Sequence, residues 1–338
     1  MSEYYLGIDL HKRRSYVVLM DAQGKVISEG GLSNDDMSEH LNEEVPHDTT
    51  AVLEATWNWQ FMYDLLSEHC EKALLAHPQK VKMIAEATVK TDKIDAHTLA
   101  HLARTGYLPM AYAAPREIRE LRQLARHRSK LVADRTRNKN RIHATLARRN
   151  IHSPFSDIFG CKGREFLVEV ANDKLSQIDQ QVIEDNLAAI DLLNQLVDEA
   201  ESIMAEQTIH DPKVSLLKTL PGVGLITAVT IRAELGEVER FSSADRAARW
   251  AGLTPKVHVS DETVQHGSIS RQGSPYLREA MVGAALRAIR YSPRLRSFYQ
   301  RIAKRRGAGM ARVALGRKML LIAYTMLMRD EPYREDYC

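Results

Sequence analysis

The chain has 338 residues, 44% of them hydrophobic, and its formal net charge is only +3. This length predicts two or three domains with real cores. The sequence has no run of 18 apolar residues and no signal-like start, so we expect a soluble, cytoplasmic protein. Three widely spaced cysteines match no zinc site, so we expect reduced thiols.

The first hundred or so residues have an α/β pattern. Three short runs rich in Tyr, Val, Leu and Ile are expected strands: 4–10, 15–21 and 25–30. DAQG between the second and third runs is a hairpin signal. The expected elements after them are helix 34–45, a strand ending at Glu54, helix 58–70, a strand from Ala73 and a helix from Asp92. This is the ribonuclease-H-like order, which would place Asp9 and Glu54 on central strands.

Four carboxylates stand at informative places in this pattern. Asp9 and Glu54 each end a strand-like run, and Asp92 and Asp95 lie three residues apart at the start of a helical stretch. If the two strands are parallel neighbours, both carboxylates emerge at one sheet edge, and a helix across that edge would bring all four together. Carboxylates bind Mg²⁺ through oxygen. Taken singly, Asp9 could start a turn and Asp92 could cap a helix, but the joint order favours a metal site.

A long basic helix is predicted after Pro115, over residues 116–150, followed by a break at 151–163 and a second long helix at 164–206. The second helix carries a heptad-like apolar stripe, namely Leu175, Ile178, Val182, Ala189, Leu193, Leu196, Ala200 and Ile203. An antiparallel coiled-coil hairpin is the favoured arrangement, although the stripe could instead cover another domain. The hairpin would either hold a dimer or project a basic arm.

Positive charge is concentrated in two blocks. Residues 116–149 hold twelve Lys/Arg and three acids, and residues 287–318 hold eleven Lys/Arg and no acid. Such blocks attract phosphate backbones through counterion release, whereas an ordinary solvated helix face mixes both signs. The candidate nucleic-acid contacts in these blocks are Arg126, Arg128, Lys130, Arg135, Arg137, Lys139, Arg141, Arg305, Arg306 and Arg312.

Residues 212–329 are expected to form a mainly helical unit. The segment around Pro221-Gly222-Val223-Gly224 has a helix-hairpin-helix pattern, in which Gly222 and Gly224 allow a tight turn and backbone amides hold a phosphate. A second turn, with Arg271 as a candidate phosphate contact, leads into a further helix. The stretch 310–329 is an amphipathic helix, and the tail after Asp330 is expected to fray.

Six ordered motifs carry a family resemblance that spans nearly the whole chain: GID (7–9), EAT (54–56), KTDKIDA (90–96), LPGVGLITA (220–228), WAGLTP (250–255) and ISRQGSPYLR (269–278). The set resembles the DEDD insertion-sequence transposases of insertion-sequence family one-hundred-and-ten, which also includes the Piv-type DNA invertases. Two places depart from the family pattern. Trp57 stands where a small residue is usual, and 256–266 lacks the usual basic, glycine-rich character.

The resemblance implies a RuvC-like (ribonuclease-H-like) DEDD domain at 1–110, a coiled coil at 111–210 and a C-terminal transposase domain at 211–330, followed by a tail at 331–338. It implies a nucleoid-associated, site-specific recombinase with Asp9, Glu54, Asp92 and Asp95 as catalytic ligands of Mg²⁺ or Mn²⁺. Its partners would be target and donor DNA, a bridge-type guide RNA that pairs with both, and further copies of the chain in a dimer or tetramer. No membrane partner is expected.

The resemblance also implies a nucleophilic serine shortly after the WAGLTP motif. The matching position is Ser260, whose hydroxyl would form a covalent 5′-phosphoserine link with cleaved DNA. Nearby Ser268, Ser270 and Ser274 have the pattern of phosphate contacts or helix N-caps. Two alternatives remain open from the sequence: a RuvC-like metal nuclease that uses water as its nucleophile, and a non-catalytic nucleic-acid scaffold whose carboxylates are helix caps.

Overall fold

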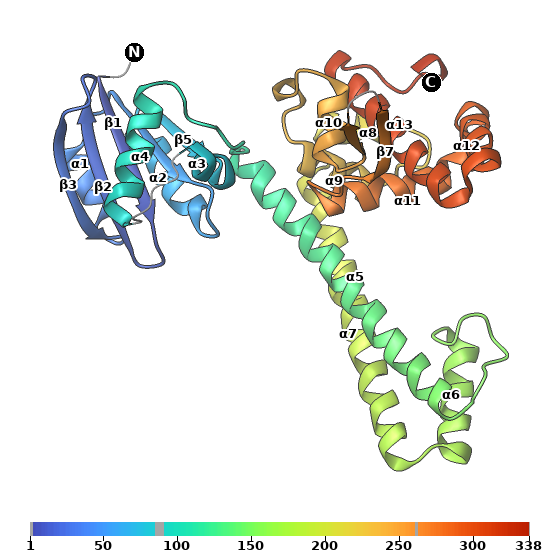
Figure 1. Cartoon of the computed structure of the whole chain (residues 1–338). Coiled ribbons are helices and arrows are strands. Elements are labelled where there is room, and N and C mark those ends of the chain that lie inside the picture. Colours follow the sequence, from blue (N-terminus) through green and yellow to red (C-terminus); the bar gives the residue numbers. More distant parts are fainter. Residues whose placement is uncertain (1–2, 85–90, 261–262, 338) are drawn as a thin grey trace. The chain divides into compact units, whose positions relative to one another are not determined.

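The computed structural model describes residues 3–84, 91–260 and 263–337, and the chain divides into two compact units, Met1–Ala113 and Ala114–Cys338 (Figure 1). The first unit is α/β and the second is almost entirely helical. None of the helices in the described ranges is long and apolar enough to cross a membrane.

The first unit is built on a five-stranded sheet. Its strands are β1 (Tyr4–Leu10), β2 (Arg14–Asp21), β3 (Val26–Ser33), β4 (Thr49–Glu54) and β5 (Lys72–Ala76). They lie in the order β3-β2-β1-β4-β5; β1 pairs antiparallel with β2 and parallel with β4. The expected strands and the DAQG hairpin are confirmed, with Gly24 at φ +87° in the turn. The central strands β1 and β4 are thus parallel neighbours.

Helices cover both faces of this sheet (Figure 1). They are α1 (Met37–Glu44), α2 (Trp59–His69), α3 (Pro78–Ile84) and α4 (Asp92–Arg104). Apolar side chains of α1 and α2 pack with Leu6, Ile8 and Leu53 on one face. On the other face, Ala96 and Ala100 of α4 pack with strand residues of β2. Side chains alternate along a strand, so β1 contributes bulky residues to one layer and Gly7 to the other.

Gly7 permits an unusually close approach of α4 to β1. A methyl group at Gly7 would lie 2.1 Å from the carbonyl oxygen of Ala96 and 2.8 Å from the amide nitrogen of Ala100. Both neighbours are helix backbone, which cannot move aside as a flexible side chain can. Glycine is therefore required here by packing, and the contact fixes the height of α4 above the sheet.

Gly7→Ala should push α4 away from β1 and lower the free energy of unfolding by about 1–3 kcal/mol, because the added methyl overpacks a backbone contact. The matched control is Gly30→Ala on β3, where a methyl group would meet nothing within 4 Å. Denaturant unfolding of the two variants checks this. Equal stability of Gly7→Ala and the parent protein would contradict the close contact.

The second unit begins with a helical hairpin, formed by α5 (Arg116–Arg148), α6 (Cys161–Lys174) and α7 (Gln177–Gln207), with α5 packed along α7 (Figure 1). The prediction of one helix over 164–206 is wrong, because the chain breaks at Leu175 and Ser176. Ser176 begins α7 as its N-cap: its hydroxyl accepts a hydrogen bond from the amide of Asp179. A serine followed three residues later by an acid is a helix-start signal.

Most residues in the buried stripe of α7 follow a residue of the predicted stripe by one position in the sequence. The residues buried along α7 are Asp179, Ile183, Asn186, Ile190, Val197, Ala200 and Met204. Of the stripe predicted from the sequence, Ala200 is buried, whereas Ile178 and Ile203 are exposed. Two apolar rows run side by side on this helix, and two polar residues interrupt the buried one. Those polar residues are satisfied internally: Arg149 donates to Asp179, and the Asn186 amide donates to the Val182 carbonyl.

The rest of the second unit has one core at the root of the hairpin, formed mainly by its helices. Its elements are α8 (Pro212–Leu217), α9 (Leu225–Leu235), η1 (Val238–Arg240), α10 (Ala244–Trp250), β6 (Pro255–Ser260), β7 (Thr263–Ile269), α11 (Pro275–Tyr291), α12 (Pro293–Arg306), α13 (Ala308–Arg329) and η2 (Glu335–Tyr337).

The prediction that the tail after Asp330 is frayed is wrong. The Ser292 hydroxyl donates to Glu335, and the Tyr333 amide donates to the Thr219 hydroxyl, so the described tail docks on the unit.

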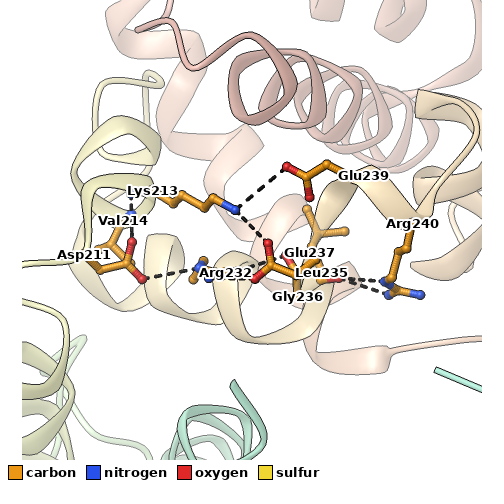
Figure 2. A network of polar contacts seen from close by, with 9 residues as sticks. All are labelled: Asp211, Lys213, Val214, Arg232, Leu235, Gly236, Glu237, Glu239 and Arg240. Atoms are coloured by element: carbon orange, nitrogen blue, oxygen red, sulfur yellow. Dashed lines mark hydrogen bonds and ion pairs between the residues drawn. The ribbon is translucent and has the colours of Figure 1, made fainter. Parts of the chain in front are cut away.

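An ionic network joins α8 to the end of α9 (Figure 2). The Arg232 guanidinium donates to Asp211 at the start of α8 (3.3 Å), to the Gly236 carbonyl (3.0 Å) and to Glu237 (3.1 Å). Lys213 donates to the other oxygen of Glu237 (2.8 Å). Hydrogen bonds from Lys213, and then from Arg232, hold the pKa of Glu237 below its ordinary value. The network fixes the two helices on either side of the Pro221–Gly224 turn.

Candidate metal centre and nucleic-acid contacts

Asp9 and Glu54 lie at the same edge of the first sheet. The parallel register pairs Ile8 with Leu53, so the next residue on each strand is one of the two acids. Both acids make polar or electrostatic contacts. The sequence-based expectation that they emerge from neighbouring parallel strands is confirmed. Trp57, which stands in place of a small residue, is 78% exposed and therefore leaves the packing around Glu54 undisturbed.

Asp92 and Asp95 lie in the first turn of α4. The N-cap is Thr91, whose hydroxyl accepts a hydrogen bond from the amide of Ile94, so Asp92 is not the cap. Negative side chains in a first helical turn are stabilised by the helix dipole. With Thr91 as the cap, the Asp92 carboxylate is left for another partner.

That partner is His11, in the turn that joins β1 to β2. The Nε2 atom of His11 lies 3.2 Å from Oδ2 of Asp9 and 3.2 Å from Oδ1 of Asp92. One ligand atom from each of these three residues falls within 4.8 Å of the others, which is close enough to share one cation. Two carboxylates and an imidazole are a suitable donor set for a divalent metal ion, so the residues present fit the cation that a DEDD site implies.

His11 was not among the residues predicted from the sequence. The side chain lies two residues beyond Asp9 in GIDLHK, past the end of the strand, and no helical or strand spacing relates it to Asp92. Only the packing of α4 across β1 reveals the pairing. The sole signal available was the polar residue immediately after the strand that carries the first acid.

Several arginines of the basic helix α5 have partners inside the second unit. Arg126 forms a two-point ion pair with Glu234 on α9 (2.6 and 2.9 Å), and the Glu234 side chain is only 1% exposed. Arg128 pairs with Glu201, and Arg135 donates to Asn194, both on α7. These three guanidinium groups hold the hairpin together and attach it to α9.

The remaining candidate cations on α5 lie nearer to solvent. Lys130 and Arg141 are exposed, and Arg137 is exposed and pairs with Asp134 on its own helix. Lys139 lies over the Phe159 ring, 4.7 Å from its centroid. The positive charge of α5 is therefore divided between internal contacts and an exposed face.

Arg126→Met should lower the free energy of unfolding by about 2–4 kcal/mol, because it leaves the buried Glu234 carboxylate without its cation. The control Arg137→Met removes an exposed pair within one helix and should cost about 1 kcal/mol or less. Thermal or denaturant unfolding measures both. If Arg126→Met weakens nucleic-acid binding with unchanged stability, the contact with Glu234 is not the main role of Arg126.

The Pro221–Gly224 turn lines an open groove of about 740 Å³ between α7, α9 and α11. Gly222 has φ +81°, and a methyl there would lie 2.5 Å from the Ala284 carbonyl, so packing requires this glycine. Gly224 is the N-cap of α9, with open space beside it and no side-chain cap. Arg287 donates to the Gly222 carbonyl and to the Thr227 hydroxyl at the same end of the helix. The turn thus brings the backbone amides at the start of α9, which no side chain caps, close to the Arg287 guanidinium.

The other candidate cations of this unit differ in their surroundings. Arg271 is exposed, with φ +55°, in the turn before α11. Arg305 and Arg306 are exposed at the end of α12, whereas Arg312 donates to the Ala308 carbonyl within α13. The expected N-cap role of Ser274 is confirmed, since its hydroxyl accepts from the Leu277 amide.

Ser260 is the last residue of β6 and pairs with Thr263 of β7. The side chain of Ser260 lies outside what the structure describes, and so do residues 261–262. For the expected nucleophile, the structure therefore describes only the backbone, which lies at the end of a two-stranded hairpin.

Known protein families match both units. A family model described as "Transposase" matches residues 6–151, and the model "Transposase IS116/IS110/IS902 family" matches residues 214–300. A "Probable family 20 transposase" of Pseudomonas aeruginosa is 25% identical over 97% of this chain and 98% of that protein. The "Transposase for insertion sequence element IS1111A" of Coxiella burnetii is 26% identical over 77% of this chain and 72% of its own length. The "Pilin gene-inverting protein" of Moraxella bovis is 24% identical, with 87% and 84% covered.

Proposed function

Because the chain belongs to the IS116/IS110/IS902 family of transposases, we propose that it is a site-specific recombinase that cuts and rejoins DNA with the metal site at Asp9, Glu54, Asp92 and Asp95. The observation that carries the proposal is the meeting of Asp9 and Asp92 around one potential cation position. The order β3-β2-β1-β4-β5 supports a ribonuclease-H-like assignment of this unit. Such folds carry their acids at the ends of central strands, as here.

A bound Mg²⁺ or Mn²⁺ ion would neutralise charge on the phosphodiester and activate the attacking oxygen. The chain's own residues have distinct tasks in this scheme. Asp9 and Glu54 are fixed by strand pairing, and Asp92 and Asp95 are placed by the first turn of α4. Rigid strands and a helix hold ligands more precisely than loops do.

Asp92→Asn should lower metal-dependent strand cleavage by about 100-fold or more, because it removes one charged ligand oxygen of the cation. The side chain is exposed, so the fold and the binding of nucleic acid should survive. Cleavage assays with Mg²⁺ or Mn²⁺, and with a chelator as the blank, measure the effect. The control is Asp36→Asn at the N-cap of α1, which makes no side-chain capping bond. Undiminished cleavage by Asp92→Asn would remove Asp92 from the site.

The serine nucleophile is a further part of the proposal. The Ser260 hydroxyl oxygen would attack the phosphorus, form a bond to the 5′ phosphate and release the 3′ oxygen as a hydroxyl. A covalent link of this kind retains the energy of the broken bond, so strands can be rejoined without ATP. Water as the nucleophile would lose that energy. The position of Ser260 after the WAGLTP motif supports the assignment.

Ser260→Ala should abolish the covalent protein–DNA adduct, because it deletes only the attacking oxygen. Denaturing gel electrophoresis of end-labelled DNA detects the adduct, and Ser268→Ala serves as the matched control in the same hairpin. An adduct that persists in Ser260→Ala would assign the nucleophile elsewhere. Metal-dependent cleavage without any adduct in the parent protein would favour a water-using nuclease.

Nucleic-acid binding and assembly complete the proposal. Exposed cations on α5 (Lys130, Arg137 and Arg141) and at the end of α12 (Arg305 and Arg306) would contact phosphates of target DNA, donor DNA and a bridge-type guide RNA. The absence of acidic residues from the sequence of α12 supports that role. Recombination joins two duplexes, so at least two copies of the chain are needed. The exposed row of α7 that includes Ile178 and Ile203 would pack between protomers.

A further inference from the structure

We propose that His11 supplies a nitrogen ligand to the divalent cation, so that the metal site is a mixed carboxylate–imidazole centre. The inference rests on the metal site of the proposed function and names an additional residue in it. His11 stands outside the four carboxylates and belongs to a different segment, the turn after β1.

The distances around His11 match those between metal ligands. Adjacent ligands of an octahedral ion with bonds of about 2.1 Å lie roughly 3 Å apart. The Nε2 atom lies 3.2 Å from one carboxylate oxygen of Asp9 and 3.2 Å from one of Asp92. A single nitrogen at this spacing from two acids could therefore bind the same cation as both of them.

The backbone of His11 is held by two side-chain amides from distant parts of the unit. Asn34, after β3, and Asn58, before α2, each donate an amide hydrogen bond of 3.0 Å to the His11 carbonyl. The His11 amide donates to the Arg14 carbonyl, which closes the turn. These contacts hold the backbone from which the imidazole extends, although the residue lies in a surface turn.

Of the two asparagines that bind the His11 carbonyl, Asn58 also connects His11 to the segment after Glu54. The Thr56 hydroxyl donates to the Asn58 side-chain oxygen (3.1 Å), and the Thr56 amide donates to the Glu54 carbonyl (2.8 Å). Hydrogen bonds therefore run from the end of β4 to the turn after β1. Supporting contacts of this kind orient metal ligands and raise their affinity.

An ordinary ion pair explains this arrangement less well. The side chains of His11 and Asp92 are 53% and 62% exposed, and an exposed ion pair contributes at most about 1 kcal/mol. A metal ligand, in contrast, must be held close to its final position before the ion arrives. For ligation Nε2 must present its lone pair, with the ring proton on Nδ1.

A nitrogen donor changes which ions bind best. Imidazole favours transition-metal ions, whereas sites made only of oxygen favour Mg²⁺ and Ca²⁺. With His11 as a ligand, the site should prefer Mn²⁺ or Co²⁺ over Mg²⁺ more strongly than four carboxylates would. His11→Gln should reduce Mn²⁺ affinity by about tenfold and Mg²⁺ affinity by less.

Pulsed electron paramagnetic resonance of Mn²⁺ bound to the full chain tests the ligation, because a directly bound imidazole nitrogen modulates the spin echo. The chain has 13 histidines, so variants identify the source. His11→Gln, and His11→Asn as a second variant, should remove the nitrogen modulation. The control is His69→Gln, at the opposite end of α2 from Asn58 and about 15 Å along the helix, which should keep it.

Mn²⁺ bound to the parent protein without nitrogen modulation would overturn the inference, and so would modulation that persists in both His11 variants. Those results would leave the carboxylate site intact, with His11 outside the set of metal ligands. The proposed metal site has a separate test in the same titration. If Asp9→Asn binds Mn²⁺ as tightly as the parent protein, the site itself is wrong.

Discussion

The backbone of α4 rests directly on Gly7 of β1, and this contact determines where the acidic start of the helix can lie. A larger residue at position 7 would meet the carbonyl of Ala96 and lift the helix. Strand pairing places Asp9 and Glu54 at one edge, but only the seated helix brings Asp92 within reach of His11. The candidate metal site of the first unit therefore depends on Gly7, although Gly7 has no side chain that could bind a metal.

Charge in the second unit serves two purposes. Arg126 neutralises the buried Glu234, and Arg232 and Lys213 share Glu237, so several cations stabilise the fold itself. The acid-free block of α12 leaves Arg305 and Arg306 in solvent. Local charge excess thus overstates the number of cations available to nucleic acid. Under the proposed function, contacts with phosphate would be made by the exposed cations, which are fewer than the sequence suggests.

The sequence predicts the sheet well because most strands carry a strong apolar pattern and DAQG marks the turn between β2 and β3. It predicts the hairpin less well. On α7 the buried row contains Asp179 and Asn186, which look like surface residues, while the apolar Ile178 and Ile203 of the neighbouring row are exposed. Their internal partners appear only in three dimensions. His11 was not predicted for the same reason: it lies more than eighty residues from Asp92 in the sequence, and only tertiary packing brings the two side chains together.

Iron-directed cleavage of the polypeptide tests most directly whether β1, β4 and α4 surround one divalent cation. Fe²⁺ bound in place of the native ion, with ascorbate and peroxide, generates radicals that cut the nearest backbone. Mass spectrometry should find cuts confined to residues near 9–11, 54–58 and 92–95, and excess Mg²⁺ or Mn²⁺ should suppress all of them together. Cuts in only one of these segments, or at sites elsewhere in the chain, would contradict a shared metal centre.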